Sequence, residues 1–272
     1  MINETFSFPR FRNYFVYDLK QLWRNNGRAV IVLGGLSLLS YLLWVTCALI
    51  FTHGWQAPTL AARGTIFYIG ALILVLYNTR SYGYLTEKKA GSAWLMVPAS
   101  ALEKFISMMI ITVFVFPLAY VASYMLIDGV ICLIDSTAGQ ALIGGIGPLT
   151  QMISEGLERA GEQGLSFNLS VLAFPVLLQF ISNLLYFLLC GICFKKWKLI
   201  GAFGILVGVE IVITAVLSII TLGNVEWFNN LNDVASLESF MNAAMTVAGF
   251  INAALVLGLG WGIYHRIKTL KH

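Results

Sequence analysis

The sequence has few charged residues. Only 11% of its 272 residues are Asp, Glu, Lys or Arg, whereas a soluble globular domain carries about a quarter. This scarcity argues against an ordinary soluble fold, and the mean hydropathy of +0.81 points the same way. Several apolar runs reach the roughly 20 residues that a helix needs to cross a ~30 Å hydrocarbon layer. We therefore predict an all-α, multi-pass membrane protein.

Motifs that mark several enzyme classes are also missing. The chain has no GxxxxGK[ST] loop, whose amides and lysine hold nucleotide phosphates, and no HExxH or paired-carboxylate motif. His53, His265 and His272 fall near or beyond the ends of apolar runs, so none is matched with a mid-span serine as a serine hydrolase requires. We expect no enzyme activity, no metal site and no cofactor in this chain.

Cysteine is scarce, and all four cysteines lie in apolar runs, which predicts no disulfide framework. Cys190 and Cys193 form a CxxC pair near the end of a run, and we interpret them as small apolar helix residues. The first apolar run starts near Ala29 after a polar, basic lead, which favours a retained anchor over a cleaved leader.

Six runs are predicted to span the membrane, and together they make residues 1–272 a single transmembrane domain. Residues 1–28 are expected to form a cytoplasmic interfacial helix, residues 29–264 the six-span bundle, and residues 265–272 a cytoplasmic tail. The third run must tilt, kink at Pro117 or project beyond the membrane, because it has about 30 residues. The predicted spans are residues 29–51, 58–79, 105–134, 171–194, 199–222 and 243–264.

Basic residues between the spans predict the orientation. Of the 17 Lys and Arg residues, all but two fall before the first span, after the last, or in the loops 80–104 and 195–198. Only Arg63 and Arg159 fall on the other side. Positive-inside bias therefore places both termini in the cytoplasm, and an even number of spans agrees.

The N-terminal segment, residues 9–28, has the pattern of a helix in the membrane interface. Its apolar stripe and its basic side indicate a membrane anchor, and a contact with a partner protein is an equally open interpretation. The stripe consists of Phe11, Tyr14, Phe15, Leu19, Leu22 and Trp23, and the residues mostly off it are Arg12, Asp18, Lys20 and Arg24.

Two loops are expected outside. Residues 135–170 are rich in glycine and acidic residues, and residues 223–242 are acidic with apolar side chains at near-helical spacing. The second loop either rests on the membrane surface or is a plain surface loop.

The cytoplasmic loop contains the stretch GSAWLMVPASALEKF, residues 91–105. Ser100 and Glu103 form a capping box, so a helix is expected to begin at Ser100. Pro98 hinders extension of a helix arriving from upstream, and Gly91 is expected to end the helix that continues the second span. The apolar residues 93–97 between them face the cytoplasm and need cover from lipid, from the chain itself or from a partner.

The segment WLMVPASALEKF, residues 94–105, resembles the permease subunits of type-2 bacterial ABC exporters, especially those of Bacteroidetes. The six spans, the amphipathic leading helix and the cytoplasmic termini extend the resemblance. It implies a dimer of permease subunits, identical or different, with separate ATPase subunits that bind ATP and Mg. The outer loop 135–170 is longer than this family leads us to expect. The resemblance makes the loop 86–104 the coupling element to the ATPase and nominates Glu87, Trp94, Pro98, Ser100 and Glu103.

Within the spans, Glu210 is the central acidic residue, and it either lines a translocation path or makes a structural hydrogen bond. Arg63 is expected to snorkel towards a surface and Asp128 to meet lipid headgroups. Small-residue stripes suited to close helix packing, within or between subunits, comprise Gly201, Gly204 and Gly208 in the fifth span and Gly258 and Gly262 in the sixth.

The sequence therefore favours an ABC exporter permease and leaves two alternatives. One is a non-catalytic membrane scaffold or sensor partner, in which the 93–97 segment binds a regulator. The other is an ion-coupled carrier that uses Glu210. Lipid, peptide, polysaccharide and drug all stay open as substrates.

Overall fold

The structure is a computed structural model that describes residues 6–143, 169–223 and 234–270. The described residues are almost entirely helical, and no strand occurs among them. The first half of the chain comprises α1 (Phe8–Leu22), the π-helical turn η1 (Trp23–Gly27), α2 (Arg28–Gly34), α3 (Leu36–Phe51), α4 (Leu60–Ser81), the 3₁₀ turn η2 (Gly83–Thr86), α5 (Lys88–Met96), α6 (Ala101–Ile110), the π-helical turn η3 (Ile111–Val115), α7 (Phe116–Ile134) and η4 (Ser136–Ala138). The rest comprises α9 (Leu169–Cys193), α10 (Lys198–Gly223) and α12 (Val234–Thr269).

Six helical segments are long and apolar enough to cross a membrane, which confirms the predicted class of a multi-pass helical membrane protein. Each overlaps one of the six predicted spans, and the ends differ by up to seven residues, at Thr86 in the second span and at Ala215 in the fifth. The segments are Arg28–Phe51, Leu60–Thr86, Ala101–Ile134, Phe174–Cys193, Lys198–Ala215 and Asn242–Thr269.

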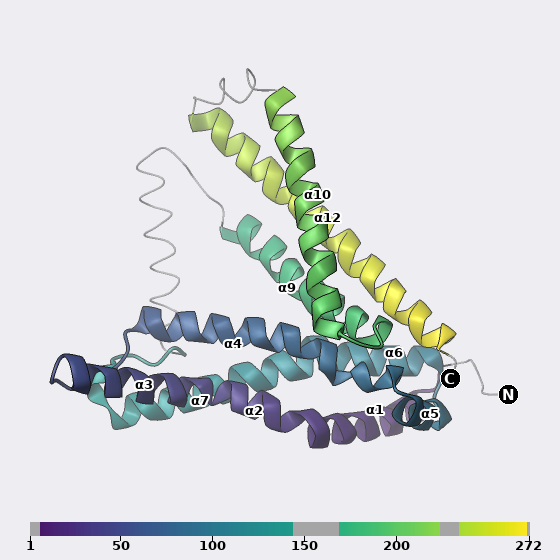
Figure 1. Ribbon diagram of the computed structural model, residues 1–272, viewed down its shortest axis with the longest axis horizontal. Helices are drawn as coiled ribbons and strands as arrows, with labels where there is room; N and C mark the ends of the chain where they lie inside the picture. The colour runs from purple at the N-terminus through teal and green to yellow at the C-terminus, as the bar shows by residue number, and fades with distance from the viewer. Residues whose placement is uncertain (1–5, 144–168, 224–233, 271–272) are drawn as a thin grey trace.

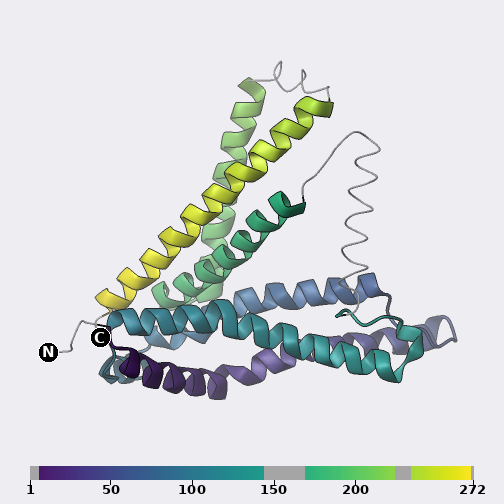
Figure 2. The same ribbon diagram turned by 180° about the vertical axis from the view of Figure 1, so that it is seen from behind.

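The helices form two groups that diverge from one end of the molecule (Figures 1 and 2). Helices α1 to α4, α6 and α7 run along the long axis, while α9, α10 and α12 lean away from them. The fourth span joins the groups, because α9 packs on both α4 and α12. In the most apolar stretch of the fourth span 44% is buried, against 6% in that of the fifth span. Helix α10 therefore lies at the periphery of the single chain.

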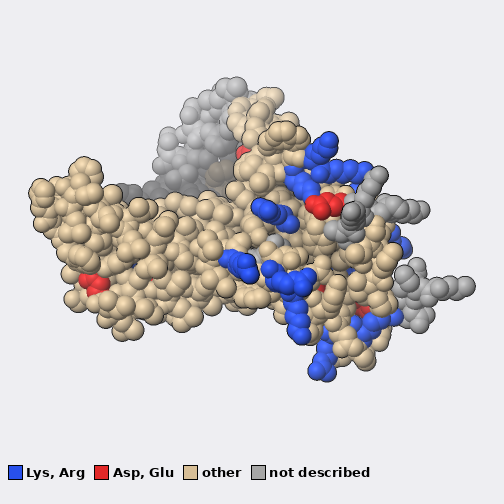
Figure 3. All heavy atoms as spheres, turned by 60° about the horizontal axis from the view of Figure 1, so that its bottom comes forward, with Lys and Arg blue, Asp and Glu red and all other residues tan. Residues whose placement is uncertain are grey.

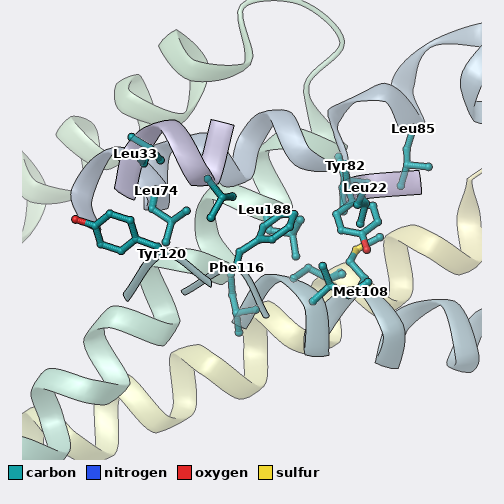
Figure 4. Close-up of a cluster of buried hydrophobic side chains, with 14 of the residues drawn as sticks. Leu22, Leu33, Leu74, Tyr82, Leu85, Met108, Phe116, Tyr120 and Leu188 are labelled. Carbon is teal, nitrogen blue, oxygen red and sulfur yellow. The ribbon is translucent and has the colours of Figure 1, made fainter. Parts of the chain in front are cut away.

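The largest buried cluster runs along the first group and into α9. Figure 4 shows Leu22, Leu74, Tyr82, Met108 and Leu188 pointing into it from α1, α4, α6 and α9 and from the turn before η2. Between membrane-spanning helices such packing relies mainly on van der Waals contact, because lipid chains are as apolar as leucine. Shape complementarity therefore fixes how these helices lie against one another.

Two glycines allow close contacts between helices that border this cluster. A Cβ on Gly191 of α9 would collide with the backbone of Thr79 in α4, and a Cβ on Gly70 of α4 would collide with the hydroxyl of Tyr120 in α7. Backbone atoms do not move aside as a flexible side chain does, so Gly191 lets α9 lie directly on α4. This contact joins the two groups of helices.

The third span begins as predicted and contains an irregularity that the sequence suggested only in part. The capping box at Ser100 and Glu103 is present. The span then runs as α6, η3 and α7, and the π-helical turn ends at Val115, two residues before Pro117. Proline removes one backbone donor and crowds the carbonyl four residues earlier, so the helix widens locally there.

Two loop predictions are wrong in detail. Gly91 does not end a helix, because α5 runs through it from Lys88 to Met96. Residues 93–96 are therefore helical and not an irregular connection. The predicted outer loop 223–242 is shortened, because α12 already begins at Val234. Residues 144–168 and 224–233, which make up most of the two outer loops, lie outside the described residues.

Candidate functional site

Basic side chains gather at the end of the molecule where the two groups of helices meet. Figure 3 shows Lys and Arg concentrated there, and few on the opposite part of the same face. The start of α1, the end of α12 and the short helix α5 lie at this basic end in Figure 1. The distribution matches the predicted clustering of basic residues on one side, whereas the orientation in a membrane stays a prediction.

Helix α5 lies at this end, and it follows the second span and precedes the third. It begins after Glu87, whose backbone is extended, and ends at Val97, which is also extended. Ala93, Met96 and Pro98 face outward, and Met96 is 82% exposed. A short helix with an exposed apolar tip thus stands between two membrane-spanning helices.

Trp94 holds α5 against the rest of the chain. Its side chain is buried, and its indole Nε1 donates to the hydroxyl of Tyr14 in α1 over 3.0 Å. Lys104 of α6 donates from Nζ to the backbone carbonyl of Trp94 at 3.0 Å, and the same Nζ lies 4.5 Å from the centre of the indole ring. The cation–π contact adds to the hydrogen bond because both are shielded from water. Trp94 therefore links α5 to both α1 and α6.

Glu103 forms a second joint between α1 and α6. Its carboxylate accepts from the guanidinium of Arg10 at 2.7–3.0 Å and from the backbone N–H of Ser7 at 2.9 Å. It also accepts from the backbone N–H of Ser100 at 2.9 Å, which completes the capping box. The Glu103 side chain is fully buried, whereas that of Arg10 is 28% exposed. The hydrogen bond from Arg10 raises the pKa of that guanidinium.

Asp18 forms a third joint, and it is buried inside the protein. Its Oδ2 accepts from the hydroxyl of Tyr82 at 2.9 Å and from that of Ser107 at 2.7 Å. Burial raises the pKa of Asp18 to about 6, and the two hydroxyl donors oppose the shift. One carboxyl group thus joins α1 to the end of the second span and to α6.

Replacing Asp18 with Asn is expected to remove a pH dependence of stability. The pKa rises from 3.8 in the unfolded chain to about 6, so protonation favours the folded state. The contribution is complete below pH of about 4 and is lost as the pH rises through 6. A shift of about two units corresponds to about 3 kcal/mol. Unfolding in detergent should show a parent protein that gains most of this between pH 7 and pH 4 relative to D18N, and equal pH profiles would contradict the assignment.

The predicted coupling residues divide into two kinds. Glu87 and Pro98 are exposed and available to a partner. Trp94, Ser100 and Glu103 are buried and act within the chain, where they fix α5 and the start of the third span.

Sequence reasoning missed the contribution of α1 to this site. Asp18 was predicted to lie mostly off the apolar stripe, yet it lies on the buried face with Tyr14 and Leu22. The spacing of four residues between these three positions places them on one helix face. That spacing was the available signal. It was overlooked because Asp18 is charged and was therefore grouped with the polar residues off the stripe.

Glu210 and most of the predicted packing glycines lie away from neighbouring helices. Glu210 is exposed on α10. A Cβ at Gly204, Gly208 or Gly258 would meet nothing within 4 Å, whereas one at Gly262 would lie 3.5 Å from Leu189. At the remaining position, Gly201, a Cβ would lie 3.2 Å from the ring of Phe194. Packing between subunits at the open positions stays a prediction.

The predictions for Arg63 and Asp128 are wrong. Arg63 is 3% exposed and Asp128 is fully buried, and the guanidinium Nη1 lies 3.0 Å from Oδ1 of Asp128. Arg63 also donates to the carbonyls of Ala138 and Gln140, and Asp128 accepts from the backbone N–H of Leu142. The two opposite charges pair because neither side chain reaches water. The pair and its hydrogen bonds hold α4, α7 and the segment after η4 together at the end opposite α5.

Comparisons with protein-family models, with curated proteins and with solved structures returned no match. The resemblance of residues 94–105 to exporter permeases is therefore carried forward as a proposal.

Proposed function

We propose that the chain is the permease subunit of an ATP-driven exporter, in which α5 binds a separate ATPase subunit. One observation carries the proposal. Helix α5 exposes an apolar tip at the basic end while Trp94 ties it to α1 and α6. A force applied to α5 therefore acts on the second and third spans at once.

The proposed mechanism uses this linkage. Closure of the ATPase subunits around ATP and Mg moves α5, and the joints at Trp94, Glu103 and Asp18 pass the motion to α1 and α6. Rigid-body movement of packed helices is a common way to switch a membrane cavity between its two openings. A second permease subunit completes the transporter, and the exposed apolar faces of α10 and α12 support such an interface. We place the assembly in a bacterial inner membrane with both termini in the cytoplasm.

Replacing Met96 with Glu is expected to reduce copurification of the ATPase subunit at least about tenfold. A charge introduced at the centre of an interface typically costs more than a truncation, and central contacts contribute about 2 kcal/mol or more. The measurement is purification in mild detergent, with mass spectrometry to identify a partner that carries a phosphate-binding loop and an assay of its ATP hydrolysis. Ile143→Glu is the matched control, because Ile143 is also exposed but lies near the opposite end.

A cysteine in place of Ala93 provides a second, independent readout. In the nucleotide-bound complex it is expected to crosslink to the ATPase subunit and to be protected from maleimide labelling. Free labelling in that complex would contradict the proposal and favour a scaffold whose partner binds elsewhere. Transport that needs Glu210 and no ATP would instead favour the ion-coupled carrier.

A further inference from the structure

A second feature of the basic end is a cavity of about 1060 Å³, and the residues at the apolar tip of α5 do not line it. Its walls come from three places along the chain, where α1 leads into α2, where α4 leads into η2, and where α9 leads into α10. Each wall includes one end of a membrane-spanning helix. The cavity therefore lies at the boundary between the predicted hydrocarbon layer and the cytoplasmic surface.

The cavity carries an excess of positive charge. Four basic side chains line it, those of Arg28, Arg80, Lys195 and Lys198, and one acidic side chain, that of Glu87, which gives a net charge of 4 − 1 = +3. Arg28, Arg80 and Lys195 are exposed, and none forms an ion pair with a carboxylate of the described residues. The Nζ of Lys198 donates to the carbonyl of Gly83. Uncompensated like charges repel one another across the cavity, and a bound anion would relieve that repulsion.

The same cavity has an apolar and aromatic border. Leu199 and Ile200, at the start of α10, line it and are 46% and 61% exposed. Trp197 lines it too, is 75% exposed, and has a left-handed backbone with φ of 55°. Tryptophan at this depth is typical of the headgroup region. Cations inside and exposed apolar residues at the rim match a ligand with a negative head and apolar chains.

We propose that this cavity binds the phosphodiester headgroup of an anionic phospholipid. Arg28 and Arg80 donate to the phosphate oxygens, for which the planar guanidinium is well suited. Lys195 adds a third positive charge, and the acyl chains lie along Leu199 and Ile200. Basic pockets between membrane helices on the cytoplasmic side are suited to such headgroups. The proposal does not depend on the exporter function, because none of the five residues belongs to the tip of α5.

The test is native mass spectrometry of the full chain in neutral detergent, titrated with phosphatidylglycerol or with phosphatidylcholine. We expect specific binding of phosphatidylglycerol and at least about tenfold weaker binding of phosphatidylcholine. The triple variant R28Q/R80Q/K195Q should lose on the order of 100-fold in affinity, because each basic residue near a membrane surface contributes roughly fivefold. Inorganic phosphate in excess should compete poorly, because it lacks the chains that contact α10.

The triple variant R12Q/R24Q/K196Q is the matched control, because it removes the same charges from exposed positions outside the cavity. It should bind phosphatidylglycerol as the parent does, and melting temperature should show that both triple variants are folded. Equal affinity for the two lipids, or equal loss in the two variants, would overturn the site. Full displacement of the lipid by phosphate would overturn the role of the chains, and binding of polyglutamate without binding of lipid would favour an acidic protein partner.

Discussion

Replacing Asp128 with Asn is expected to lower the free energy of unfolding by about 3–5 kcal/mol, because the change leaves the Arg63 guanidinium buried without its counter-charge. Arg63 is 3% exposed and lies 3.0 Å from the lost carboxylate oxygen. Its Nη2 already donates to the carbonyls of Ala138 and Gln140, so these acceptors cannot take over from the carboxylate. Unfolding by SDS in mixed micelles, followed by circular dichroism, measures the difference.

The control is Glu210→Gln, which also neutralises a carboxylate in an apolar helix. Glu210 is exposed and takes part in no ion pair among the described residues, so we expect no loss of stability, because neutralising a carboxylate at the centre of an apolar span removes a cost. The double variant R63M/D128L should recover part of the loss, because it removes both charges together. It cannot recover all of it, since the backbone N–H of Leu142 loses its acceptor as well. A D128N protein as stable as the parent would contradict the buried ion pair.

The class of the protein and the spans were predictable because hydropathy acts locally. A helix crosses a membrane when its own residues are apolar over sufficient length, so all six spans could be placed without knowing what they contact. The capping box was predictable for the same reason, since Ser100 and Glu103 are three residues apart. The π-helical turn before Pro117 was predictable only in part. The proline predicts an irregular helix, whereas the form of the irregularity also depends on neighbouring helices.

The contacts between distant segments could not be predicted from one sequence. Arg63 and Asp128 are 65 residues apart, and the sequence around either residue gives no sign that the two side chains form a pair. Glycines behave in the same way. Gly204 and Gly208 form a recognisable stripe yet meet open space, whereas Gly191, which belongs to no stripe, makes the close contact with α4. A spacing rule describes one helix face, but only the fold determines which face meets a neighbour.

Replacing Glu103 with Ala is expected to release α1 from α6 and to lower the free energy of unfolding by about 2–4 kcal/mol. The change removes three interactions at once, the ion pair with Arg10, the acceptor for Ser7 and half of the capping box at Ser100. Hydrogen bonds to a charged group contribute about 1.5–3 kcal/mol each when buried. The contribution of the Arg10 pair is smaller, because the Arg10 side chain is 28% exposed and water screens the interaction.

Hydrogen exchange of the α1 amides separates release of the helix from general loss of stability. In E103A the amides near Arg10 should exchange at least about tenfold faster. The exchange rates of the α9 amides should change only as much as the global stability requires. Glu87→Ala is the control, because Glu87 is exposed and forms no ion pair with the described residues. The double variant R10A/E103A should lose less than the sum of the two single variants, since the residues share one interaction.

If α5 receives force from an ATPase, E103A will retain ATP hydrolysis in the complex and lose transport, because α1 no longer follows α6. Unchanged protection of α1 would contradict the joint and the route of force through it.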